Sequence, residues 1–265
     1  MSIPFRLSSG YLIGIPATIF LCISTLGFLQ VPQLNELKAG AETKSLADIN
    51  QDLQAEELQL SLLQEFPNLG FENLIAKWAF LRFLQYFGDD EVRAKTGYNL
   101  SPEYFETILE RDPNFIDGYL FLSGSTTLYA GMPERTVELM NQKLAKLSPD
   151  APKSYHPWRY KGTDELLFLG DYEAAQRSFD MAADLASGFS DPESEVVVSV
   201  SRRTAQFLAQ NPTSKSAQVS AWSTILNNAF DDETRKLAIN QIKALGGQVM
   251  IDNQGRISIG LPEQD

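Results

Sequence analysis

The sequence predicts an all-α chain: an N-terminal transmembrane helix, then a superhelix of α-helical hairpins, then a small C-terminal β-hairpin. Three observations predict this order. An uncharged, mainly apolar stretch lies near the N-terminus, segments with apolar residues three or four positions apart follow it, and the last residues alternate apolar and polar side chains. The predicted divisions are 1–31 (lead and membrane anchor), 32–66 (linker and amphipathic helix), 67–189 (helical repeats), 190–246 (further helices) and 247–265 (β-hairpin and tail).

Composition excludes several classes of function. The chain has 265 residues and a formal net charge of −12, with 34 acidic against 22 basic residues. Because this charge repels phosphate backbones, we expect no nucleic-acid partner. A single cysteine, Cys22, and a single histidine, His156, exclude an intramolecular disulfide and any zinc site built from several cysteines or histidines. We expect no metal and no cofactor.

The membrane anchor is predicted from an uncharged run. Residues 7–35 contain no Lys, Arg, Asp or Glu, and residues 11–29 are almost entirely apolar. As a helix, the apolar run would span roughly 28 Å, which is about one hydrocarbon core. The charge of Arg6 before it and the acidic bulk after it place the N-terminus in the cytoplasm and the rest on the periplasmic or lumenal side. The alternative is a cleaved signal peptide, for which Ala39-Gly40-Ala41 resembles a cleavage site.

Small residues recur every four positions in this stretch, at Gly10, Gly14, Thr18 and Cys22. Such a stripe lets another membrane helix approach closely, so Gly10, Gly14 and Thr18 are candidates for packing inside the bilayer. The alternative is that glycine is simply common in membrane helices.

Two helices are expected between the linker and the clearest repeats. Ser45 and Asp48 form a pattern like a capping box, and the helix that they start carries one apolar stripe. This stripe either packs on the first repeat or forms a short coiled coil for self-association. Residues 71–87 are apolar nearly all round, so we expect this helix to be buried on several sides.

Pro, Gly, Asp and Ser residues mark where the predicted helices in the rest of the chain begin and end. Pro102 near the first helical turn, the pair Gly170-Asp171, and Asp191-Pro192 mark helix starts and stops. The run Val196-Val197-Val198 leaves a strand open as an alternative. Val249 and Ile259 belong to the alternating segments of the predicted β-hairpin, which must dock on helices because a lone hairpin is marginal in water. The predicted helices are 101–112, 119–129, 133–147, 156–169, 172–186, 191–211, 214–229 and 232–245.

The stretch 170–185 carries a resemblance. With Gly170, Tyr172, Ala175, Phe179 and Ala182 in place, the chain resembles the tetratricopeptide-repeat family. The unit before it and one still earlier match less well, so the likeness covers about 71–187. In this unit Ser187 stands where the family has a closing proline, and Gly162 and Thr163 supply the small helix-contact positions.

The resemblance implies a superhelix whose concave face, lined by first helices, holds a peptide or protein segment. The positions where the family carries a clamp for a chain-terminal carboxylate hold Leu120, Thr127, Tyr160, Asp164 and Phe168, which argues against an acidic chain terminus as the partner. The resemblance implies a binding face with Arg82 and Arg159 beside it, and its candidates are Phe83, Tyr86, Leu120, Tyr160 and Asp164. The alternative is that several of these residues belong to the ordinary core between helices.

The segment from Trp78 to Gly88 also resembles a segment of bacterial membrane-anchored repeat proteins of undefined role, some of them in photosynthetic bacteria. These likenesses imply a non-enzymatic, membrane-anchored scaffold that binds a protein and serves the assembly or maintenance of a membrane complex, such as a photosynthetic one. Two alternatives remain open. One is a permanent accessory subunit, held through the membrane stripe and the helix around Trp78. The other is a hydrolase that uses His156 or the acidic cluster Asp89-Asp90-Glu91, which are otherwise ordinary residues at helix starts.

Overall fold

The computed structural model describes residues 24, 25, 27, 28, 30, 31, 45–67, 70–229, 231–251 and 257–264. Two compact units divide the chain, residues 1–52 and residues 53–265. The stripe of Gly10, Gly14 and Thr18 and most of the predicted anchor 11–29 lie outside the described residues. Within the described part, no helix is long and apolar enough to cross a membrane.

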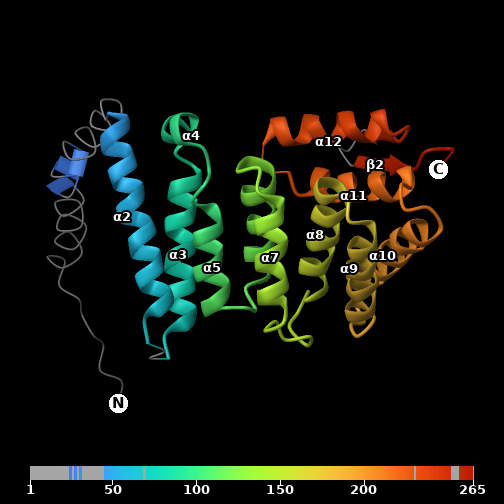
Figure 1. Ribbon diagram of the computed structural model, residues 1–265, viewed down its shortest axis with the longest axis horizontal. Coiled ribbons are helices and arrows are strands. Elements are labelled where there is room, and N and C mark those ends of the chain that lie inside the picture. Colours follow the sequence, from blue (N-terminus) through green and yellow to red (C-terminus); the bar gives the residue numbers. More distant parts are fainter. Residues whose placement is uncertain are drawn as a thin grey trace, which may run out of the picture. The chain divides into compact units, whose positions relative to one another are not determined.

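The described residues are mostly helical, with one two-stranded antiparallel sheet, which confirms the predicted class of a helical chain ending in a β-hairpin (Figure 1). The helices are α2 (Leu46–Glu65), α3 (Glu72–Phe87), α4 (Asp90–Thr96), α5 (Ser101–Arg111), α6 (Ile116–Leu122), α7 (Pro133–Leu144), α8 (Tyr155–Asp164), α9 (Tyr172–Ala186), α10 (Pro192–Gln210), α11 (Lys215–Asn227) and α12 (Asp232–Ala244). Two π-helical segments, η1 (Ser123–Tyr129) and η2 (Glu165–Leu169), continue α6 and α8, and the strands are β1 (Gln248–Ile251) and β2 (Ile257–Gly260).

Side-chain caps set several helix starts where the sequence predicts them. The carboxylate of Asp171 accepts a hydrogen bond from the backbone N–H of Ala174 at 3.0 Å, and Asp191 forms a capping box with Ser194. The capping box begins a continuous α10, so the valine run lies in a helix and the strand alternative is wrong. At α5 the N-cap residue is Leu100, and Pro102 lies in the first turn, as the sequence predicts.

The α8–α9 hairpin packs through small residues, as the sequence predicts. A Cβ added at Gly162 would lie 3.2 Å from both the Ser178 Cβ and the Phe179 ring. Ala175 and Ala182 on the same side of α9 are fully buried. Close approach of the two helices therefore depends on the absence of a side chain at Gly162.

The ends of α6 and α8 differ from the prediction. Residues 119–129 and 156–169 were expected to be regular helices, yet both end in π-helical turns. After η1 the N–H of Met132 donates to the carbonyl of Thr126 at 2.9 Å, and after η2 the N–H of Asp171 donates to that of Glu165 at 2.9 Å. π-Helical turns are rare and occur frequently at functional sites. Both lie in the first helices of successive hairpins.

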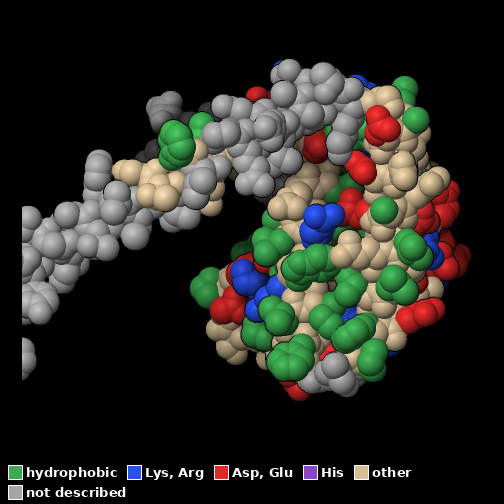
Figure 2. Space-filling model, turned by 90° about the vertical axis from the view of Figure 1, so that its left-hand side faces the viewer, with side chains coloured by type: hydrophobic (Ala, Val, Ile, Leu, Met, Phe, Trp, Pro, Cys, Tyr) green, Lys and Arg blue, Asp and Glu red, His purple; other side chains and the backbone are tan. Residues whose placement is uncertain are grey.

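The predicted burial of α3 on several sides is wrong on one side. Phe83 and Ala79 are fully buried against α5, but Leu74, Trp78 and Leu81 on the opposite side are exposed. The reason is position, because α3 and residues 53–65 of α2 lie at one end of the array formed by residues 53–265, where hydrophobic side chains gather at the surface (Figure 1 and Figure 2). We call this surface the α2–α3 face; its large exposed residues are Leu58, Leu62, Phe66, Phe71, Leu74, Trp78 and Leu81.

The C-terminal hairpin docks on helices, as expected. Val249 pairs with Ile259 in the antiparallel register. Both side chains pack against a cluster that contains Trp222 of α11 and Ile242 of α12. The predicted turn between the strands, residues 252–256, lies outside the described residues.

Candidate functional site

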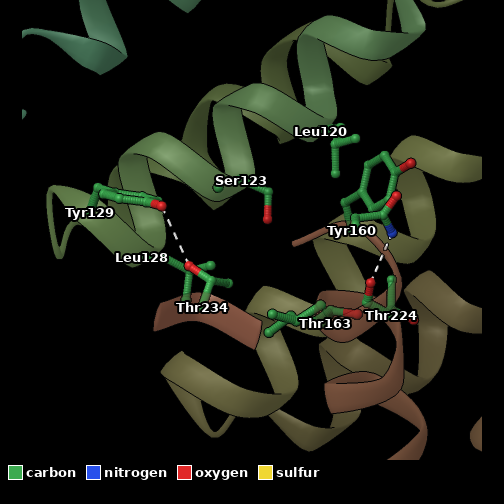
Figure 3. Close-up of a pocket in the computed structure, with 11 residues that line it drawn as sticks. Leu120, Ser123, Leu128, Tyr129, Tyr160, Thr163, Thr224 and Thr234 are labelled. Atoms are coloured by element: carbon green, nitrogen blue, oxygen red, sulfur yellow. Dashed lines mark hydrogen bonds between the residues drawn. The ribbon is translucent and has the colours of Figure 1, made fainter. Parts of the chain in front are cut away.

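A pocket lies between the continuous segment α6–η1 and the helices α8, α11 and α12 (Figure 3). The pocket opens to solvent and is small, with a cavity volume of about 30 Å³. Its walls combine apolar side chains with hydroxyl and amide groups, the usual composition of a site that orients a small group. The lining residues are Leu120, Ser123, Gly124, Leu128, Tyr129, Tyr160, Thr163, Thr224, Ile225, Asn228 and Thr234.

Two of the residues that the resemblance implies, Leu120 and Tyr160, line this pocket together (Figure 3). Leu120 comes from α6 and Tyr160 from α8, which are the first helices of successive hairpins. Tyr160 is largely buried, with 9% of its surface exposed, and burial raises the pKa of its hydroxyl to about 12. The phenol therefore stays protonated at neutral pH and can donate a hydrogen bond.

Asp164 lies behind the pocket wall and is not itself a lining residue. The Ser123 hydroxyl donates to its Oδ1 at 3.0 Å, which joins η1 to the end of α8. Burial raises the pKa of Asp164 to about 8, and hydrogen bonds from Ser123 and Thr127 oppose that rise. At neutral pH the carboxyl is therefore mainly neutral, and its role is to hold the Ser123 hydroxyl at the pocket.

Arg159 reaches the same wall from the other side of α8. Its Nη2 donates to the Thr224 hydroxyl at 3.1 Å, and Thr224 lines the pocket. The Nε of Arg159 is buried and has no hydrogen-bond partner in the described structure. Burial lowers the pKa of this guanidinium from its ordinary value.

The other three implied residues lie elsewhere. Phe83 is fully buried, and Tyr86 is buried with its hydroxyl accepting a hydrogen bond from the Leu100 N–H at 3.1 Å. Both are core residues of the α3–α5 pair rather than lining residues of a binding face. Arg82 pairs with Glu56 of α2 at 2.7 Å, so it links two helices.

The histidine has a carboxylate partner. The Nε2 of His156 lies 2.9 Å from Glu193, and its ring stacks on Tyr160. Burial lowers the pKa of the imidazole, while the bond to Glu193 opposes this change. Within the described residues no serine, threonine or cysteine side chain is hydrogen-bonded to His156.

The acidic cluster at 89–91 starts a helix. The carboxylate of Asp89 accepts a hydrogen bond from the Val92 N–H at 3.2 Å and caps α4. This geometry confirms the interpretation of the cluster as an ordinary helix start.

A buried ion pair fixes the segment η2 against α9. Lys161 and Glu165 are 7% and 2% exposed and form a charged hydrogen bond one helical turn apart. Ser178 of α9 completes the network, since its hydroxyl donates to Glu165 Oε2 at 2.6 Å and accepts from Lys161 Nζ at 3.0 Å. This network ties the π-helical end of α8 to α9.

The polar lining residues were missed by reasoning from sequence. Thr163 was assigned only to helix packing, whereas its hydroxyl is buried at the pocket without a hydrogen-bond partner in the described structure. Thr224 and Asn228 come from α11, which the resemblance does not cover. One available signal was the run of small polar residues 123–127 in an otherwise apolar helix, which coincides with η1.

Comparisons with known proteins add no function to this geometry. No family model, no curated protein and no solved structure matches the chain. The likeness to tetratricopeptide repeats rests on Gly170, Tyr172, Ala175, Phe179 and Ala182.

Proposed function

We propose that this chain is a scaffold of tetratricopeptide-like helical repeats that binds a segment of another protein. Its proposed setting is a membrane, to which residues 11–29 anchor it, with the repeats on the periplasmic or lumenal side. The observation that carries the proposal is the pocket itself, because the first helices of two successive hairpins, α6 and α8, both contribute to it. In a helical repeat, that shared side is where a ligand segment lies.

The pocket supports recognition of one partner side chain at a time. Leu120, Leu128 and Ile225 offer apolar contact, while the hydroxyls of Ser123 and Thr163 offer hydrogen bonds to a nearby backbone. A membrane tether would confine the pocket to the membrane surface and raise the effective concentration of membrane-bound partners. This arrangement suits the assembly or maintenance of a membrane complex.

A second candidate, a permanent accessory subunit, is favoured by the α2–α3 face. Seven large hydrophobic side chains are exposed there, and Leu74 alone is 65% exposed. Large exposed apolar patches mark interaction sites, and permanent interfaces are the more hydrophobic class. For this function the helix around Trp78 is the principal contact.

The two candidates differ in which surface a partner needs. Leu120→Gln alters the pocket and Trp78→Gln alters the α2–α3 face, and each serves as the control for the other. The measurement is co-purification of the tagged full chain from membranes after mild detergent extraction. The scaffold predicts that Leu120→Gln loses the partner while Trp78→Gln keeps it, whereas the permanent subunit predicts the reverse at fixed stoichiometry. No partner with the unaltered chain would contradict both.

A further inference from the structure

A second cavity of about 340 Å³ lies on the far side of Thr224, between α8, α10 and α11 and the strand β2. We propose that it binds an organic anion, in which an oxyanion such as a carboxylate is joined to an apolar body. The proposal does not depend on the proposed scaffold function. The lining residues are Arg159, Val196, Ser199, Val200, Arg203, Thr204, Phe207, Ser220, Ser223, Thr224, Asn227, Ile259 and Leu261.

The cavity lining carries positive charge, which favours an anionic ligand. Two arginines and no acidic residue line the cavity, in a chain that carries 34 acidic against 22 basic residues. Neither Arg159 nor Arg203 forms an ion pair with any residue in the described parts of the chain. Arg202, the neighbour of Arg203, does so with Asp184 at 2.8 Å and does not line the cavity.

Among the residues that the structure describes, the positive charge of Arg159 has no counter-charge, unlike that of the buried lysines. The buried lysines Lys143 and Lys161 each contact a carboxylate, Glu110 and Glu165. Arg159 instead contacts the neutral Thr224 hydroxyl, and its Nε is buried without a partner in the described structure. Arg159 as a whole is partly buried, but a guanidinium with a buried nitrogen and no counter-charge is costly, so an anion in the cavity would relieve this cost.

Neutral donors stand beside the two guanidinium groups. Ser199 of α10 and Asn227 of α11 line the cavity, and within the described residues their side chains make no hydrogen bond. A hydroxyl and a carboxamide donate to an oxyanion without adding charge. With the planar guanidinium of Arg159, which suits a carboxylate in two-point contact, they form a set of donors without a competing acid.

Apolar side chains also line the cavity and set the body of the ligand. Val196 and Val200 come from α10, while Ile259 and Leu261 come from the C-terminal hairpin and the residue that follows it. Phe207 lies under the guanidinium of Arg203, with 5.5 Å between the Arg203 Cζ and the ring centroid. A cavity of this size fits a short acyl chain or one apolar residue next to an acidic group.

The test is calorimetric titration of the full chain in lipid nanodiscs, with empty nanodiscs subtracted, at constant ionic strength. The probe is sodium octanoate, which carries both the oxyanion and the apolar body. We expect octanoate to bind, and Arg203→Ala to weaken binding by about tenfold or more, as loss of a charged hydrogen bond implies. Arg203 is exposed, so this variant should fold. Arg202→Ala, which removes the same charge one residue away, is expected to bind octanoate unchanged.

One further variant and two further probes test the proposal in the same titration. Arg159→Lys keeps the charge but loses the planar fork, and is also expected to weaken binding. A capped peptide with one glutamate between two leucines identifies the source: tighter binding than octanoate would indicate a polypeptide ligand, and weaker binding a free organic acid. Absence of binding by both probes would overturn the proposal. Equal effects of Arg202→Ala and Arg203→Ala, or equally tight binding of uncharged 1-octanol, would also overturn it.

Discussion

Replacing Glu165 by glutamine is expected to lower the free energy of unfolding by about 3–5 kcal/mol, the usual cost of leaving one member of a buried ion pair alone. Lys161 and Glu165 are both largely buried, and Ser178 bridges them. The glutamine cannot balance the Lys161 ammonium, which then stays buried without a counter-charge. Chemical denaturation followed by far-ultraviolet circular dichroism measures the loss.

Two comparisons separate the buried pair from a general effect of charge. Glu173→Gln removes one member of an exposed pair on α9, in which Arg177 lies 3.8 Å away, and is expected to cost less than about 1 kcal/mol. The double variant Lys161→Met with Glu165→Leu is expected to recover much of the lost stability, because two apolar residues replace both charges. A loss below about 1 kcal/mol for Glu165→Gln would show that the network does not hold η2 in place.

Replacing Asp164 by asparagine is expected to change how stability depends on pH. The folded pKa of about 8 is raised by burial above the unfolded value of about 3.9. A carboxyl whose pKa is raised by folding binds a proton more tightly in the folded chain. Its contribution to the free energy of unfolding is therefore fully present below about pH 4 and is lost as pH rises through about 8. Between these limits the loss is about 1.4 kcal/mol for each pH unit.

Asparagine has the same shape and no charge to bury, so the variant should escape this loss. Its free energy of unfolding, relative to the unaltered chain, is expected to rise by about 3–4 kcal/mol between pH 5 and pH 8. Urea denaturation at several pH values measures this difference. Ser123→Ala, which removes a hydrogen bond that lowers the pKa, is expected to extend the loss to higher pH. Parallel stability curves for Asp164→Asn and the unaltered chain would contradict the account.

Helix starts and the main hairpin could be predicted because they depend on local chemistry. Asp171 and Asp191 cap helices through their own side chains, and Gly162 faces Phe179 across two neighbouring helices. Such features are set by residues near each other in the chain, so a single sequence carries them.

The burial of α3 could not be predicted, because it depends on what lies beside the helix. An apolar side such as that of Leu74 and Trp78 looks the same in a sequence whether another helix of the chain covers it or not. The same limit explains Phe83 and Tyr86, whose aromatic side chains suit a binding face and a core equally well. Only packing distinguishes the two.

The candidate site was predicted in part. Leu120 and Tyr160 lie in the predicted first helices of successive hairpins, and they line one pocket. Thr224 and Asn228 join them from a helix more than sixty residues further along the chain, and nothing local signals that contact. The π-helical turns were also missed, since apolar periodicity does not distinguish them from regular helix.

The central claim, that the face shared by α6 and α8 holds a protein segment, is tested most directly by site-specific photo-crosslinking in native membranes. A photoreactive phenylalanine analogue at Leu120 reports on the pocket, and the same group at exposed Arg177 of α9 reports on a different surface. The account predicts one discrete crosslinked protein from position 120 and none from position 177. Equal crosslinking from both positions, or none from position 120 in membranes where the chain is present, would contradict it.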